Sequence, residues 1–125
     1  MTRIYNITPV PKPRMTRSDK WRKRPATEKY WAFKDECKRA GLTFHSGDFI
    51  RFTIPMPDSW SKKKRVEMNG KPHRVRPDID NCIKALLDAV FEYDDAHIWK
   101  LSFSKVWGET GAIAITPGDT GAVYV

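Results

Sequence analysis

The sequence has little of several features that would assign it to a common class. It holds only two cysteines, Cys37 and Cys82, in 125 residues, too few for a disulfide-stabilised domain of this size. No Cys and His pair has the spacing of a zinc site. There is no apolar leader segment at the start and no apolar run long enough to span a membrane. We therefore expect a cytoplasmic protein with reduced cysteines and no membrane association.

Acidic residues are scarce in the first part of the chain. Residues 1–77 hold 20 of the 23 Lys and Arg but 7 of the 15 Asp and Glu, a net charge of +13. Residues 78–125 have a net charge of −5, and six of the fifteen acids lie within residues 78–95. A basic chain with one acidic cluster suggests a cation held against a polyanion. The other explanation is that the charges neutralise each other across the surface.

The length and the 40% hydrophobic content predict one domain with a single core, and no internal repeat is present. Alternation and helical spacing predict a series of elements: a strand at 3–8, a helix at 27–40, a strand at 48–54, a short helix at 60–68, a helix after Asp78, and strands at 97–106 and 112–116. The last two strands are expected to form a hairpin, with a bulge in the first. This order favours an α+β fold, a small mixed sheet with helices packed on one face, and a loose tail at 117–125.

The helix at 27–40 has recognisable ends. Thr27 is a plausible cap and Gly41 a natural stop. Its aromatic residues, Tyr30, Trp31 and Phe33, are expected to pack in the core.

Two basic segments precede the acidic cluster. The first is a loop at 9–25 whose prolines exclude a helix at its start; it carries Trp21 and the cations Lys12, Arg14, Arg17, Lys20, Arg22, Lys23 and Arg24. The second contains Lys62, Lys63, Lys64 and Arg65, and is followed by Arg74 and Arg76. Such residues can hold phosphates and stack on bases. A solvated surface is the ordinary alternative, and the proximity of the second segment to the acids favours phosphate binding there.

The acidic cluster has the composition of a magnesium site. Mg²⁺ prefers oxygen ligands and is usually bound by one or two carboxylates together with water and substrate phosphate. Asp78 and Asp80 can converge if Asp78 is extended, and Asp94 or Asp95 would close the site if the next strand returned beside the helix start. Lys84 shares a helical face with Asp80 and could stabilise charge in a phosphoryl transition state.

The structural alternative explains the same residues. Asp78 can cap the helix, Asp80 in the first turn is favoured by the helix dipole, and Asp80 with Lys84 is an ordinary i,i+4 pair. Asp94 and Asp95 can be a polar turn. Physical arguments favour the magnesium site and the structural interpretation about equally.

The segment RPDIDNCIKALLDAV, followed by DDAHI, resembles the RusA family of Holliday-junction resolvases, including its phage-borne members. The N-terminal PVPKPR also resembles that family, but the specific part of the match lies within residues 76–98. The chain departs from the family pattern in the short connection from Ala89 to Asp94, which has no glycine turn, and at His97, where Gln is common. The short connection leaves open which of Asp94 and Asp95 reaches the metal.

The resemblance implies a magnesium-dependent endodeoxyribonuclease, with manganese as a substitute ion and no organic cofactor. It would resolve four-way or branched DNA by paired symmetric nicks, as a homodimer with one metal site per subunit, in a bacterial cell and from a phage or prophage gene. Asp78, Asp80 and Asp95 correspond to the metal-binding catalytic residues, Lys84 to a functional lysine, and Asp88 to a further acidic position. The DNA backbone would be held by Lys12, Arg14, Arg17, Arg22, Lys23, Arg24, Lys62, Lys63, Lys64, Arg65, Arg74 and Arg76.

Two other functions remain open at this point. The first is a non-catalytic DNA-binding accessory protein with a relic metal site, for which Asp80→Asn would leave function intact. The second is an RNase or flap nuclease, which keeps the chemistry and changes the substrate.

Overall fold

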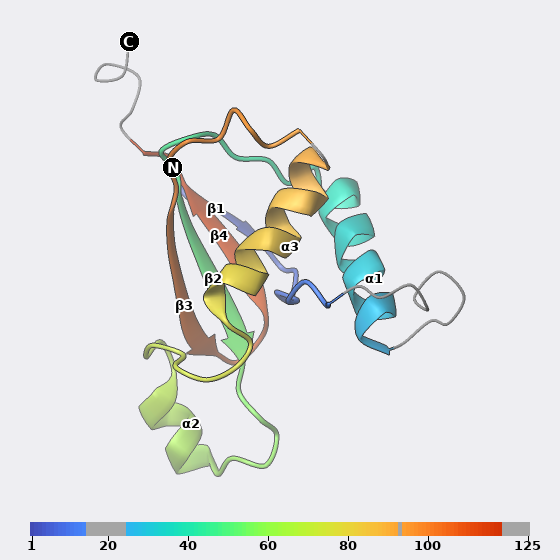
Figure 1. The fold of residues 1–125 in the computed structure, drawn as a ribbon. Coiled ribbons are helices and arrows are strands. Elements are labelled where there is room, and N and C mark those ends of the chain that lie inside the picture. Colours follow the sequence, from blue (N-terminus) through green and yellow to red (C-terminus); the bar gives the residue numbers. More distant parts are fainter. Residues whose placement is uncertain (15–24, 93, 119–125) are drawn as a thin grey trace.

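The computed structural model describes residues 1–14, 25–92 and 94–118, and it shows a single α+β domain (Figure 1). Its elements follow the order β1-α1-β2-α2-α3-β3-β4. A four-stranded mixed sheet with helices beside it confirms the predicted fold class. Within the described ranges, no helix is long and apolar enough to cross a membrane.

The sheet has the strand order β1-β4-β2-β3. Its strands are β1 (Arg3–Tyr5), β2 (Phe49–Pro55), β3 (Ser102–Gly108) and β4 (Ala112–Thr116). Strand β4 is antiparallel to both β1 and β2, whereas β3 pairs with β2 in parallel. Because side chains alternate between the two faces of a strand, one face of the central strands collects the buried residues Ile50, Phe52, Ile54, Ile113 and Ile115.

The predicted hairpin at 98–116 is wrong, because β2 lies between β3 and β4. A short turn joins the two strands at one end of the sheet, where the Met56 amide donates a 3.0 Å hydrogen bond to the Gly108 carbonyl. Two alternating segments joined by a turn look the same in sequence whether they are neighbours or flank a third strand. The strand predicted at 97–106 begins only at Ser102, and its pairing with β2 is continuous, without the expected bulge.

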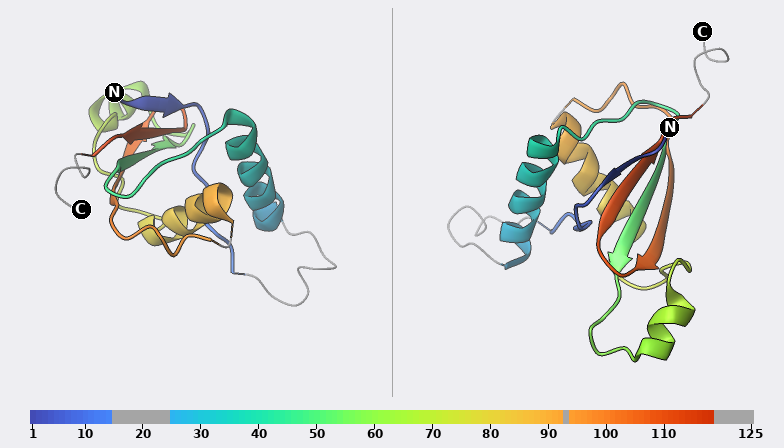
Figure 2. Two further views of the ribbon diagram at one scale, coloured as in Figure 1. Left: turned by 90° about the horizontal axis from the view of Figure 1, so that it is seen from above. Right: turned by 180° about the vertical axis from the view of Figure 1, so that it is seen from behind.

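The helices α1 (Pro25–Ala40) and α3 (Ile79–Phe91) lie on the same side of the sheet (Figure 2). Both contribute to the core, where their fully buried residues include Phe33, Cys37, Cys82, Ala85 and Leu86. Both cysteines are free thiols, as expected. Burial raises the pKa of Cys37 to about 12 and that of Cys82 to about 11, so both behave as small apolar core residues.

Two expectations for α1 are wrong. The helix begins at Pro25, so Thr27 lies inside its first turn, and the Thr27 hydroxyl is buried without a hydrogen-bond partner among the described residues. Proline is favoured at the first position of a helix, which explains the earlier start. Trp31 is 50% exposed, although Tyr30 and Phe33 are buried as predicted. Gly41 ends the helix with a φ of +66°, as its conformational freedom allows.

Helix α2 (Lys62–Met68) projects beyond the end of the sheet, away from α1 and α3 (Figure 1). Ser61 caps it by accepting a 3.2 Å hydrogen bond from the Lys64 amide. The Arg65 guanidinium fastens it to the domain, because it donates to the Pro57 carbonyl at 2.8 Å and to Glu109 at 3.0 Å. The predicted strand at 3–8 is shorter than expected, and most of the predicted tail, residues 119–125, lies outside the described residues.

Candidate functional site

Asp78 and Asp80, the acidic pair, stand at the start of α3. Asp78 is the N-cap residue and has the expected extended backbone, with φ −67° and ψ 146°. Its side chain makes no capping hydrogen bond, and both carboxylates are exposed. The structural alternative for Asp78, that its side chain caps the helix, therefore does not describe this residue. Its carboxylate is exposed and remains available to a ligand.

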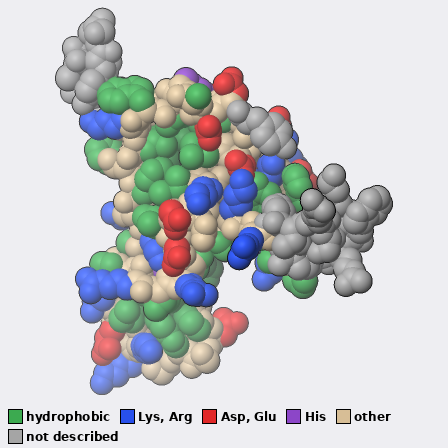
Figure 3. Space-filling view, viewed as in Figure 1, with side chains coloured by type: hydrophobic (Ala, Val, Ile, Leu, Met, Phe, Trp, Pro, Cys, Tyr) green, Lys and Arg blue, Asp and Glu red, His purple; other side chains and the backbone are tan. Residues whose placement is uncertain are grey.

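Lys84 lies one turn along the same helix from Asp80. Its ammonium is 3.8 Å from the Asp80 carboxylate, and the two side chains are 60% and 65% exposed. An exposed i,i+4 pair of this length contributes only a few tenths of a kcal/mol to stability. The pair therefore leaves Lys84 available to an incoming phosphate and Asp80 available to a cation. Figure 3 shows acidic side chains near the start of α3 with Lys and Arg side chains around them.

Lys105 of β3 fixes the peptide that leads into the acidic pair. Its ammonium donates to the Val75 carbonyl at 2.6 Å, to the Pro77 carbonyl at 2.7 Å and to His73 Nδ1 at 2.9 Å. Burial lowers the pKa of His73, and the neighbouring Lys105 charge lowers it further. His73 is therefore neutral near pH 7, and its Nδ1 can accept a hydrogen bond from the third N–H of the lysine. Lys105 thus uses all three of its donors to hold the residues immediately before Asp78.

Asp94 and Asp95 follow the C-terminal end of α3, where the Asp94 amide donates to the Phe91 carbonyl at 2.9 Å, whereas the acidic pair stands at the start of this helix (Figure 1). A helix of thirteen residues is about 20 Å long. Strand β3 starts at the same end as Asp95 and runs back toward the helix start only from Ser102 onward. The following strand therefore does not return Asp95 to Asp78 within one chain. Consistent with this separation, the described residues contain no group of three His, Cys, Asp or Glu that could hold a metal ion.

The Asp88 carboxylate is held by contacts within the domain. Its carboxylate accepts a 2.6 Å hydrogen bond from the Tyr30 hydroxyl and forms a 2.8 Å ion pair with Lys12. The Lys12 amide also donates to the Asn81 carbonyl at 3.0 Å. These contacts join α1, the segment after β1 and α3. Asp88 and Lys12, which sequence reasoning considered for the site, thus have structural partners.

The predicted DNA-binding cations fall into three groups. Arg74 and Arg76 are exposed and line a hollow with the acidic pair and Lys105, while Arg14 lines a second hollow with Lys84. On α2, Lys62 and Lys63 are exposed and form no ion pair with another described residue, whereas Lys64 stacks over Trp60 at 4.3 Å and Arg65 holds Glu109. The remaining predicted residues, Arg17, Arg22, Lys23 and Arg24, lie outside the described part of the chain.

Sequence reasoning missed two contributors to this site. Lys105 stands in a strand at a polar position of the alternation, where an exposed lysine is ordinary, so no local signal distinguishes it. Tyr30 was expected only to pack in the core, and its hydroxyl bond to Asp88 spans 58 positions in sequence. Both depend on contacts that no local pattern encodes.

Comparison with known proteins gives one result. The family model described as "Endodeoxyribonuclease RusA" matches residues 5–116, a range that includes Asp78, Asp80, Lys84 and Asp95. None of the curated proteins matches the chain.

Proposed function

Because this chain belongs to the RusA family of endodeoxyribonucleases, which resolve Holliday junctions, we propose that it cuts four-way or branched DNA in a magnesium-dependent reaction by paired, symmetric nicks. The observation that carries the proposal is the acidic pair, two exposed carboxylates within the matched range. Of these two residues, Asp78 has an extended backbone and its side chain makes no capping hydrogen bond. Both carboxylates stand among cations able to hold a DNA backbone.

The acidic pair suits a hard cation. Asp78 and Asp80 offer only carboxylate oxygens, the ligands that Mg²⁺ prefers, and Mn²⁺ accepts the same donors. The ion would polarise the phosphoryl oxygen and lower the pKa of the attacking water. Lys105 keeps the backbone of Asp78 in place, and Lys84 is long and exposed enough to meet the charge that develops on the phosphate.

Asp95 enters this site through a second copy of the chain. Within one copy the helix separates Asp95 from the acidic pair. Two α3 helices packed antiparallel about a two-fold axis would bring Asp95 of each copy toward the acidic pair of the other. A half-buried apolar stripe, Ile79, Ile83 and Leu87, follows α3 beside the exposed Asp80, and its four-residue spacing suits helix-to-helix packing. The homodimer that the family resemblance implies would then be a requirement of the metal site.

The dimer also accounts for paired cuts. A two-fold axis carries two equivalent sites, and a four-way junction presents two strands of like polarity to them. Arg74 and Arg76 lie beside each site, and Lys62 and Lys63 on the projecting α2 extend the cationic surface outward. Phosphate contacts carry no base information, so recognition of the junction rests on shape and falls steeply with salt.

The direct test is cleavage of a synthetic four-way junction and a matched linear duplex, with magnesium and with EDTA. We expect magnesium-dependent, symmetric nicking of the junction by the wild type. Asp80→Asn should lower the rate about a hundredfold or more, because it removes a ligand charge from the reacting centre. Glu67→Gln, which removes an exposed acid on α2, is the matched control and should cut normally.

Three results would contradict the proposal. Binding without cleavage, even with manganese, would identify a DNA-binding accessory protein with a relic metal site. Cleavage of flaps or RNA in place of junctions would keep the chemistry and change the substrate. Full activity of Asp80→Asn would exclude the proposed metal site.

A further inference from the structure

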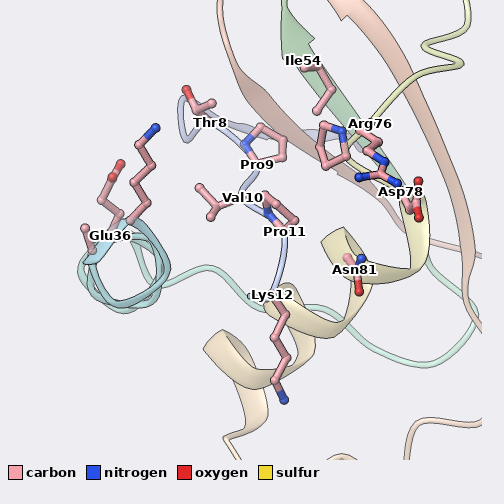
Figure 4. A pocket seen from close by; sticks show the side chains of 13 residues that line it. Thr8, Pro9, Val10, Pro11, Lys12, Glu36, Ile54, Arg76, Asp78 and Asn81 are labelled. Atoms are coloured by element: carbon pink, nitrogen blue, oxygen red, sulfur yellow. The ribbon is translucent and has the colours of Figure 1, made fainter. Parts of the chain in front are cut away.

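A groove of about 950 Å³ lies directly beside the acidic pair (Figure 4). Three parts of the chain enclose it: the segment from Thr8 to Lys12, the side of α1 that carries Lys29 and Ala32, and the chain from Arg76 to Asn81 at the start of α3. Asp78 belongs both to the groove and to the acidic pair. A ligand in the groove would therefore adjoin whatever the acidic pair binds.

The groove is preformed. The Lys12 amide donates to the Asn81 carbonyl at 3.0 Å, and the Lys12 ammonium pairs with Asp88 at 2.8 Å. These bonds tie the segment after β1 to α3, so both walls are fixed against each other. Lys105 holds the Pro77 carbonyl, and the Tyr30 hydroxyl ties α1, the third side, to Asp88 of α3. A site that is already formed loses little conformational entropy when a ligand binds.

The lining of the groove has the chemistry of a site for a flat, partly polar ring. Its floor is apolar and rigid, formed by Pro9, Val10, Pro11, Ile54 and Pro77. Prolines present flat hydrocarbon faces of fixed conformation. The volume lies within the range of small-molecule sites, about 300–1,000 Å³, so it suits a nucleotide and excludes a duplex.

The polar residues are placed for the rest of a nucleotide. Asn81 carries an amide that both donates and accepts, which is the group that reads the edge of a base. Lys29 and Arg76 carry positive charge that matches a sugar–phosphate backbone. Glu36 of α1 is the acid opposite Asp78 in the lining. The exposed cations Lys29 and Arg76 offset the negative charge of these two carboxylates.

We propose that this groove binds one unpaired nucleobase of the branched DNA, next to the phosphate at the acidic pair, and that Asn81 discriminates among bases there. The inference rests on the proposed nuclease function, because it takes the strand being cut as the occupant. Paired bases are stacked inside a duplex and cannot enter, whereas a base at the branch point has lost a stacking neighbour and is extruded at a lower cost. The groove thus adds a local sequence preference to recognition by shape.

The test measures binding and needs no cleavage. In the Asp80→Asn background, junction affinity is compared with and without a base at each position next to the branch. We expect removal of one particular base to weaken binding about tenfold, the scale of a single stacked base. Ala32→Trp fills the groove from an exposed position on α1. This variant should bind the junction that has the base and the junction that lacks it with equal affinity. Ala40→Trp is the matched control, because Ala40 is exposed on the same helix outside the groove. This variant should still bind the junction that lacks the base more weakly than the junction that has it.

A second variant tests the role of Asn81. Asn81→Ala should bind junctions that carry each of the four bases at the sensitive position with equal affinity, whereas the Asp80→Asn parent should prefer one. The groove proposal is overturned if no base removal matters, or if Ala32→Trp keeps the full difference. Failure of the nuclease proposal would appear separately, as a wild type that binds junctions and never cuts them.

Discussion

Lys105 shows how one residue outside the acidic cluster can set the geometry of that cluster. Its ammonium is hydrogen-bonded to the Val75 and Pro77 carbonyls and to His73. Pro77 is bonded directly to Asp78, so a displacement of the one moves the other. Mutation of residues that orient metal ligands typically lowers metal affinity or activity by roughly 10- to 100-fold. Lys105 is therefore a positioning residue for the proposed metal site.

We predict that Lys105→Met raises the magnesium concentration needed for half-maximal cleavage roughly tenfold. The maximal rate at saturating magnesium should fall much less, because the ligands themselves remain. Lys71→Met is the control, since Lys71 is an exposed cation close to the same loop and its loss removes the same charge. A magnesium titration of both variants separates the two effects. If Lys105→Met lowers only the thermal stability and leaves the magnesium dependence unchanged, Lys105 has no positioning role.

At the scale of elements, Asp88 joins three segments that are distant in sequence. It accepts the Tyr30 hydroxyl from α1 and the Lys12 ammonium from the segment after β1, while itself belonging to α3. Tyr30 is only 3% exposed, so its hydroxyl would lose this acceptor in a partly buried position. Losing a partner of a buried group costs more than the bond itself contributes.

We predict that Asp88→Ala lowers the free energy of unfolding by about 1–3 kcal/mol, measured by urea denaturation. Glu92→Ala is the matched control on the same helix, because Glu92 also pairs with a lysine, Lys38 at 2.8 Å, but does so in solvent. It should unfold close to the wild type, as exposed pairs contribute little. The half-saturating magnesium concentration of Asp88→Ala should match the wild type. A large increase in that concentration would instead make Asp88 a metal ligand.

Helices and strands with strong local patterns were predictable from the sequence, but the elements against which they pair in the fold were not. The spacing of Ile79, Ile83 and Leu87 and the stop at Gly41 identify α3 and α1, because helical periodicity is a local property. The insertion of β2 between β3 and β4 is non-local, so the hairpin prediction failed. The same distinction holds for the site: Asp78 and Asp80 share one turn and are found together, whereas in the dimer that we propose Asp95 reaches them only from the other copy.

At the scale of the whole molecule, the two ends of α3 hold the two halves of the proposed metal site. A single chain cannot close it, because the helix is rigid and about 20 Å long. A symmetric dimer can, if each copy lends Asp95 to the other. This arrangement would make metal binding, and hence cutting, depend on dimer formation, which protects DNA from a lone subunit.

Mixing two inactive variants distinguishes this arrangement from a site within one chain. If Asp95 acts in the other subunit, a heterodimer of Asp80→Asn and Asp95→Asn subunits places both substitutions in one site and leaves the second site intact. We therefore predict that heterodimers purified with two different tags recover single-strand nicking of the junction, at about half the wild-type rate or less, while either homodimer is inactive. If each site is built from one chain, both sites of the heterodimer carry a substitution and no activity returns. The same experiment with Asp94→Asn in place of Asp95→Asn tells which of the two aspartates is required. An Asp94→Asn homodimer that cuts normally assigns the role to Asp95.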